Sequence, residues 1–319
     1  MESRVLFLFL LLFLLQLCDS ARDRLWDSVY EARVDVVEDL IEEYLQDPHR
    51  IQSGVFPTDV NRVEQENGRT AMFMCGMKDI DRNDFKHRQK TDKSCTYIAK
   101  LLHETGADMT HVDNHGVSIL SMASLRGLTS LSKYLIQHGG ADINQSDNEG
   151  YTPLHKATAH GYIDTAIMLV SEGASLAARD NDGRSPLVLL VSLALAEPSF
   201  QKQLREFLTA VSIPAAARST NTRSVQQLDI DTPRDPQGRT PLHYAVLGKD
   251  MPVARILIEF GADPSLVDAF GVSALGMVRE TDPGRLAEMT NLIREGMVKV
   301  VERKHQDWIK SQDNEWNDL

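Results

Sequence analysis

The chain has 319 residues, of which 42% are hydrophobic and 25% charged, enough apolar material for a folded core. Its formal net charge of -12 argues against a nucleic-acid partner, because phosphate binding needs a basic face. Aromatic residues make up only 6%, which favours helices packed through small side chains over an aromatic-cored sheet.

Residues 1–20 have the layout of a secretory signal peptide. Arg4 precedes a run of Leu and Phe. The small residues Cys18 and Ser20 occupy the -3 and -1 positions of a cleavage site after Ser20. The alternative is an uncleaved membrane anchor, but the run is shorter than the roughly 30 Å hydrocarbon core requires. We therefore expect a mature chain without a membrane span, secreted or held in the endoplasmic reticulum lumen.

Two other placements remain open. The chain ends in Asp318-Leu319 rather than in a Lys-Asp-Glu-Leu retrieval signal, so secretion and retention are both compatible with the sequence. A cytosolic protein whose leader is a misread start is a further alternative.

After loss of Cys18 with the leader, the mature chain keeps two cysteines, Cys75 and Cys95. In an oxidising compartment these either form one disulfide or remain two buried thiols. Two cysteines without His-x-x-x-His spacing do not make a structural zinc site, so neither a metal nor a cofactor is expected.

The folded region is predicted to span 21–311. Residues 22–45 are predicted to form two short amphipathic helices that cap its N-terminal end, with a turn at 33–35. A unit beginning at Gly68 follows, and it carries a charged insertion at 78–93 without clear periodicity, which we interpret as a loop.

Two regular helical repeats are predicted between Gly116 and Asp180. The next repeat, which begins at Gly183, is unusual. Its first helix, from Pro186 to Ala196, is apolar nearly all round and must be covered on most sides. Polar residues at 213–234 then replace the usual ending, and we interpret them as a mobile surface loop that could instead fold over this helix.

The last two units begin at Gly238 and Gly271. The final one is predicted to run into a long helix from Arg285 to about Lys310, charged on its outer side as the end of a repeat array must be. Residues 312–319 are acidic and are expected to be a flexible tail.

Glycines recur at a fixed spacing through these units. Gly150 and Gly183 are 33 residues apart, as are Gly238 and Gly271. Thr-Pro-Leu-His-x-Ala follows Gly150 as Tyr-Thr-Pro-Leu-His-Lys-Ala and Gly238 as Arg-Thr-Pro-Leu-His-Tyr-Ala, and several units end in Gly-Ala-Asp.

In these features the sequence resembles the ankyrin-repeat family, whose signature is Thr-Pro-Leu-His-x-Ala in a 33-residue unit. The resemblance covers roughly 25 to 311 and implies an all-α fold, a helical solenoid of about six to seven repeats including caps. It also implies that His155 and His243 are structural, bonding to backbone and bridging neighbouring repeats, rather than catalytic. No nucleotide-binding, hydrolase or metalloprotease motif is present, so we do not expect an enzyme.

The resemblance places partner binding on hairpin tips and on the concave inner side of the first helices. The positions it assigns include tyrosine and arginine, residue types that are frequent hot spots. These candidate residues are Arg69, Tyr151, Arg184, Arg239, Arg126, His160 and Phe270. Four arginines in an acidic chain suggest a partner with an acidic patch, although they could equally serve only solubility.

We therefore predict a non-enzymatic protein–protein interaction module acting in the secretory pathway or extracellularly. The alternative is an inhibitor or regulatory subunit of an enzyme, docking through 78–93 and 213–234. Asn144 begins an N-glycosylation triplet, but in the family this asparagine is held by a structural hydrogen bond, so we expect little or no glycan there.

Overall fold

The computed structural model describes residues 25, 27–45, 61, 63–64, 66–74, 84–212, 230–231, 235–278 and 283–317. Over these ranges the chain is helical and contains no β-strand, only two isolated antiparallel bridges, Val112 to Ser118 and Val267 to Ser273. Contacts divide the chain into two compact units, Met1–Asn148 and Glu149–Leu319. The leader 1–20 lies outside the described residues, so its prediction stands as made.

The first unit consists of helices packed in pairs. Its named helices are α2 (Val34–Leu45), α5 (Phe85–Glu104), α6 (Ile119–Leu125) and α7 (Thr129–Gln137). Helix α5 packs between α2 and α7, and α6 packs on α7. The turn before α2 lies at residues 31–32, slightly earlier than predicted.

The predicted loop at 78–93 is wrong for its second half, because α5 begins at Phe85. Asp84 caps this helix by accepting a hydrogen bond from the His87 N–H at 2.9 Å. Within this charged segment, buried side chains recur at helical spacing, at Thr91, Cys95, Ile98 and Leu102. One buried face was therefore enough to make the segment helical, and residues 78–83 lie outside the described part.

Buried Asp92 adds a second reason for this helix to continue through the predicted loop. Its carboxylate accepts hydrogen bonds from the backbone N–H groups of Ser130 at 2.9 Å and Leu131 at 3.0 Å. These donors belong to the first turn of α7, where backbone N–H groups have no partner within the helix. A polar residue of α5 thus caps the neighbouring helix from inside the core.

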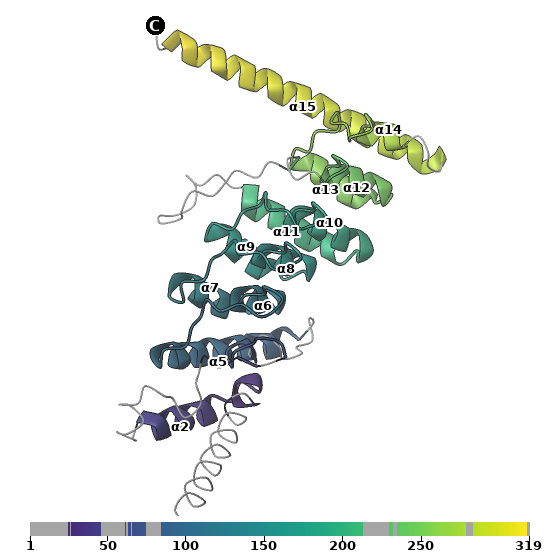
Figure 1. The fold of residues 1–319 in the computed structure, drawn as a ribbon. Helices are drawn as coiled ribbons and strands as arrows, with labels where there is room; N and C mark the ends of the chain where they lie inside the picture. The colour runs from purple at the N-terminus through teal and green to yellow at the C-terminus, as the bar shows by residue number, and fades with distance from the viewer. Residues whose placement is uncertain are drawn as a thin grey trace, which may run out of the picture. The chain divides into compact units, whose positions relative to one another are not determined.

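The second unit repeats a pattern of one short helix followed by a second helix. Successive first helices lie side by side, and so do successive second helices (Figure 1). The first helices are α8 (Pro153–Ala159), α10 (Pro186–Ala196), α12 (Pro241–Leu247) and α14 (Ala274–Val278). The second helices are α9 (Ile163–Ser171), α11 (Phe200–Ser212), α13 (Met251–Glu259) and α15 (Pro283–Asn317).

Local sequence sets the ends of these helices. Thr152 is the N-cap of α8, and Pro153 occupies the first turn, where the N–H that proline lacks would have no helical partner. After α9, Gly173 takes a φ of 105°, and the Ala174 N–H reaches back to the Leu169 carbonyl at 2.9 Å. Gly173 is therefore the left-handed helix C-cap that the Gly-Ala text predicts.

Helix α10 is covered on several sides, as its apolar composition requires. It contacts α8 and α12 on either flank and α11 and α13 from the layer of second helices. Leu187, Val188, Leu190 and Val191 are fully buried. Of the polar segment 213–234, the structure describes only residues 230 and 231, and Ile230 is buried.

The last helix is longer than predicted. Helix α15 starts at Pro283 and continues to Asn317, so the expected flexible tail at 312–319 is helical over most of its length. No glycine or proline follows Gly296, so the sequence contains no helix-breaking residue in this stretch. Among the described helices, none combines the length and apolar character that crossing a membrane requires.

Candidate binding face at the hairpin turns

The turn that precedes each first helix is built on one buried aspartate. In the turn at 180–184, the Asp180 N–H donates to the Arg184 carbonyl at 3.0 Å, and the Asp180 carboxylate accepts from the Arg184 N–H at 2.7 Å. Gly183 closes the turn with a φ of 76°, a conformation open to glycine at no steric cost. Turns that begin at Asp113, Asp235 and Asp268 have the same carboxylate-to-backbone bond.

Neighbouring turns pair through their backbones. In the second unit the Asn181 N–H donates to the Glu149 carbonyl at 3.0 Å, and the Ala269 N–H donates to the Gln237 carbonyl at 2.7 Å. A Cβ on Gly150 would lie 2.7 Å from the Asn181 nitrogen, so glycine is needed there for close approach as well as for its φ of 81°. The turns and the adjoining first-helix residues form what we call the hairpin face.

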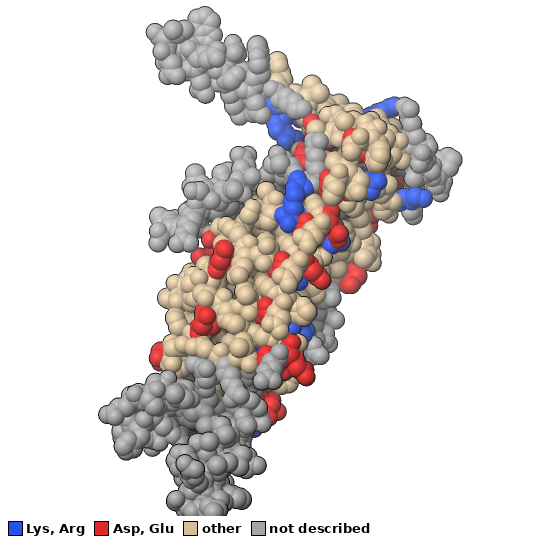
Figure 2. All heavy atoms as spheres, in the orientation of Figure 1, with Lys and Arg blue, Asp and Glu red and all other residues tan. Residues whose placement is uncertain are grey.

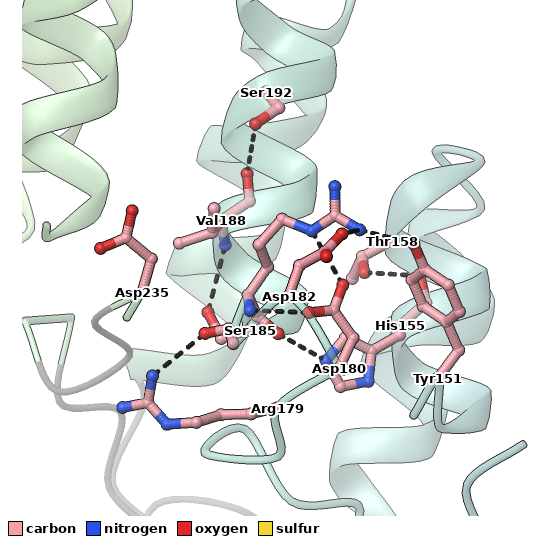
Figure 3. Close-up of polar contacts among 12 residues, drawn as sticks. Tyr151, His155, Thr158, Arg179, Asp180, Asp182, Ser185, Val188, Ser192 and Asp235 are labelled. Atoms are coloured by element: carbon pink, nitrogen blue, oxygen red, sulfur yellow. Dashed lines mark hydrogen bonds and ion pairs between the residues drawn. The ribbon is translucent and has the colours of Figure 1, made fainter. Parts of the chain in front are cut away.

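Arg184 is the centre of the best-defined polar cluster on the hairpin face. Its Nε donates to Asp180 at 2.8 Å, and its Nη2 lies 2.7 Å from Asp182 and 2.7 Å from the Tyr151 hydroxyl (Figure 3). Burial lowers the pKa of Arg184, but the hydrogen bond and charge of Asp180 outweigh it, and the net shift is upward. The guanidinium is therefore always charged and held from three sides.

Tyr151 links this cluster to the first helix of its own repeat. The Lys156 ammonium lies 4.4 Å from the centre of the Tyr151 ring, and the His155 ring meets it edge-on at 5.9 Å. Burial raises the pKa of the Tyr151 phenol. The side chain is a partly exposed aromatic held rigidly between two cations, Lys156 and Arg184.

The other two predicted turn arginines are held differently. In the first unit the Nε of Arg69 donates to buried Asp113 at 3.2 Å. In the second unit Asp235 instead accepts a hydrogen bond from the Tyr244 hydroxyl at 2.6 Å. Burial is the larger cause and this hydrogen bond the next, and together they raise the pKa of Tyr244 to about 12. Within the described residues, the buried Nε of Arg239 has no hydrogen-bond partner.

Both signature histidines are structural, as predicted. His155 and His243 are buried, and their Nε2 atoms lie within hydrogen-bond distance of the carbonyls of Arg184, at 3.1 Å, and Val272, at 3.2 Å. Each therefore joins a first helix to the following turn. The Nδ1 of His155 contacts Thr152 at the helix N-terminus, so both ring nitrogens are used.

The remaining candidate residues do not join the Arg184 cluster. Arg126 and His160 end helices α6 and α8, and His160 Nδ1 contacts the Lys156 carbonyl at 3.0 Å. Phe270 stands at a turn tip and is 73% exposed. Asn144 is exposed, and its backbone N–H donates to Asp142, so glycosylation there stays a prediction.

The cysteine prediction is not tested. Cys95 is fully buried within α5. Cys75 lies outside the described residues. In the part of the chain that the structure describes, no group of three or more His, Cys, Asp or Glu side chains could hold a metal ion.

Sequence reasoning missed the acidic half of the site. Asp180 and Asp235 were visible only as the aspartate three residues before a repeat glycine, and Tyr244 only as the variable position of the signature. The recurrence of Asp three residues before Gly was the available signal. Pairing an aspartate with the arginine four residues later requires the turn geometry.

Comparison with known proteins agrees with this geometry. A model of ankyrin repeats in three copies matches residues 91–180, and a single ankyrin repeat matches residues 237–269. The chain contains ankyrin repeats. Ankyrin repeats are protein-interaction modules, and their fold is generally a non-enzymatic scaffold.

A solved structure resembles nearly the whole chain. The ankyrin repeat domain of Bcl-3, described as a unique member of the IkappaB protein family, superposes with a TM-score of 0.59 at 19% identity. The match covers 85% of this chain and 97% of that domain. The predicted fold class, an all-α ankyrin-repeat solenoid, is confirmed by this likeness, which concerns the fold alone.

One curated protein matches over a short stretch. The transient receptor potential channel pyrexia of Drosophila melanogaster is 51% identical over 35 residues, which is 11% of this chain and 4% of the channel. A stretch of this length is about one ankyrin repeat.

Proposed function

We propose that this chain is a non-enzymatic binding module of the secretory pathway or the extracellular space, and that it holds a protein partner on its hairpin face. The Tyr151–Arg184 pair carries the proposal. Both side chains are of types that dominate interface energetics, and both are held in place before binding. An anchor that is already ordered loses little conformational entropy when a partner docks.

The proposed acidic patch on the partner is best matched to Arg239. Arg69 and Arg184 each already pair with a buried aspartate of their own repeat array. Arg239 is partly exposed, and its guanidinium forms no ion pair with a residue that the structure describes. A partner carboxylate could contact the accessible end of this guanidinium, and a hydrogen bond between two charged groups is stronger than one between neutral groups.

The charge distribution supports a local contact rather than long-range attraction. Acidic and basic side chains are interspersed over the view in Figure 2, and the described residues show no broad area of one sign there. Steering of an acidic partner by a general positive field is therefore not expected from a chain of net charge -12.

The first experiment is affinity capture of the mature chain, with mass spectrometry of the bound proteins. The captured partner is then titrated against Arg239→Gln and Tyr151→Ala, with Arg179→Gln as the matched control. Arg179 is an exposed turn residue whose guanidinium donates to the Gly183 carbonyl at 3.1 Å. Equal affinity for all variants would reject the hairpin face as the binding site.

The compartment is tested separately. Expression of the intact chain in a secretory host should yield a product that begins at Ala21, because cleavage is expected after Ser20. N-terminal sequencing of secreted and cell-bound fractions provides the measurement. An intact Met1 in every fraction would favour the anchor or cytosolic alternatives.

The alternative role, an inhibitor or regulatory subunit docking through inserted segments, has its own test. Residues 213–229 are replaced by a Gly-Ser linker of equal length, which keeps chain connectivity. A hairpin-face binder should retain its partner after this change. Loss of binding with unchanged thermal stability would favour the loop-docking role.

A further inference from the structure

A second surface of the second unit has the character of a docking groove. Its lining residues belong to the second helices α11, α13 and α15, whereas the hairpin face is built from turns and first helices. The groove has a volume of about 510 Å³. Met251, Pro252 and Ile256 of α13 supply its apolar lining.

The walls of this groove are fixed by contacts between helices. Gln201 of α11 donates to Asp250 at 3.1 Å, at the N-cap of α13, and Arg205 of α11 pairs with Glu259 at 2.7 Å near the other end. On the far side, Gly296 lets α15 approach closely, since a Cβ there would lie 2.9 Å from Ile258. The groove is therefore formed before any ligand arrives.

The rim of the groove is basic in an acidic chain. Lys202, Arg205 and Arg255 line it, against one carboxylate, Glu288. Arg205 is engaged by Glu259, and Lys202 has only a 3.6 Å contact with exposed Glu206. Exposed Arg255 forms no ion pair with any described residue. Two cations beside an apolar floor are thus available to a ligand.

We propose that this groove binds an acidic peptide segment that carries one apolar anchor residue. The anchor side chain packs on Met251, Pro252 and Ile256, and flanking carboxylates contact Arg255 and Lys202. Charge complementarity favours this occupant, because the lining residues include three cations against one carboxylate and Arg255 has no ion-pair partner among the described residues. The surface is separate from the hairpin face, so a partner could engage either or both.

The test uses the full mature chain and a short fluorescein-labelled peptide of Glu and Asp with one central Leu. We expect saturable binding by fluorescence anisotropy that weakens with added salt. The double variant Lys202→Glu/Arg255→Glu should bind about tenfold more weakly, because attraction becomes repulsion at two contacts. Glu288→Gln should bind more tightly.

Controls separate this groove from general electrostatics. Arg294→Glu/Lys299→Glu makes the same charge change at exposed positions of α15 that do not line the groove, and it should leave affinity unchanged. The peptide with Ser in place of Leu should bind more weakly, and its Lys-rich counterpart should not bind. All five changed positions are exposed, so the thermal unfolding midpoint should be the same for every variant. A variant with a lowered midpoint would be excluded from the comparison.

Changes in backbone amide chemical shifts, measured by NMR as the peptide is added, locate its binding site. Perturbation of Met251 to Ile256 supports the proposal. Perturbation confined to the turns at Arg184 and Arg239 would overturn it, while leaving the proposed function of the hairpin face intact. Absence of saturable binding, or equal affinity of the two charge-reversed double variants, would also overturn it.

Discussion

At the scale of single residues, the hairpin face is held together by carboxylates that point inward. The Asp180 side chain is 1% exposed and serves both its own turn and the Arg184 guanidinium. A buried carboxylate without a cation is costly, so the pair contributes to folding as well as to the binding face. The structural and binding roles of Arg184 can be separated by measuring the free energy of unfolding and the affinity for the partner on the same variant.

Arg184→Met keeps the apolar stem of the side chain and removes its charge. We expect a loss of about 1–3 kcal/mol in the free energy of unfolding, because Asp180 keeps only backbone partners in its turn. Urea unfolding followed by circular dichroism provides the measurement. Arg179→Met, an exposed turn change, should cost under about 0.5 kcal/mol. Equal effects of the two variants would contradict the ion-pair argument.

Tyr244 provides a prediction in pH. Burial and the bond to Asp235 raise its pKa from the ordinary 10.0 to about 12, so its neutral form is favoured in the folded state. Its contribution to stability is therefore complete below pH 10 and is lost as the pH rises towards 12. The ultraviolet titration of wild-type minus Tyr244→Phe protein should show a phenol that ionises late. A midpoint near 10 would contradict the assignment.

At the scale of elements, each repeat depends on a turn that only glycine satisfies fully. Gly150 combines a φ of 81° with close approach to the Asn181 backbone of the next turn. Gly173 has a φ of 105° but nothing within 4 Å of the position a Cβ would take. The two glycines therefore separate backbone conformation from packing between turns.

Gly150→Ala should destabilise the chain more than Gly173→Ala. Both substitutions place an alanine in the left-handed region, at about 1–2 kcal/mol. Only the first also forces apart two turns joined by the Asn181 to Glu149 hydrogen bond, so we expect at least about 1 kcal/mol more. Chemical denaturation of both variants under one buffer provides the comparison. A larger loss for Gly173→Ala would show that the turns are not close-packed.

At the scale of the whole molecule, stability is a sum of contacts between neighbouring repeats, since no repeat buries its own apolar face. Within the second unit α10 has the most apolar sequence and touches α8, α12 and the second-helix layer. Damage to this helix should therefore spread to both of its neighbours.

Leu190→Ala should cost about 2–5 kcal/mol, because a fully buried side chain is removed from a packed core. Hydrogen exchange followed by mass spectrometry should show faster exchange in α8 and α12 as well as in α10. Ser192→Ala changes an exposed residue of the same helix and should leave exchange in α8 and α12 unaltered. Faster exchange confined to α10 would contradict coupling between repeats.

Much of the fold was determined by the sequence alone. The glycine spacing and the Thr-Pro-Leu-His-x-Ala text specify turns, caps and small packing positions, all of which are local requirements. The structural role of His155 followed from the same text, because its partners lie in a repeat of known geometry.

Tertiary structure decided the features that the local sequence does not determine. Residues 85–93 are charged and were expected to be a loop, yet they are helical because one face is buried against neighbouring helices and Asp92 caps α7. The same holds for the partners of the turn arginines and for the groove beside α13. Burial and pairing depend on residues that are distant in sequence, and only the folded chain brings them together.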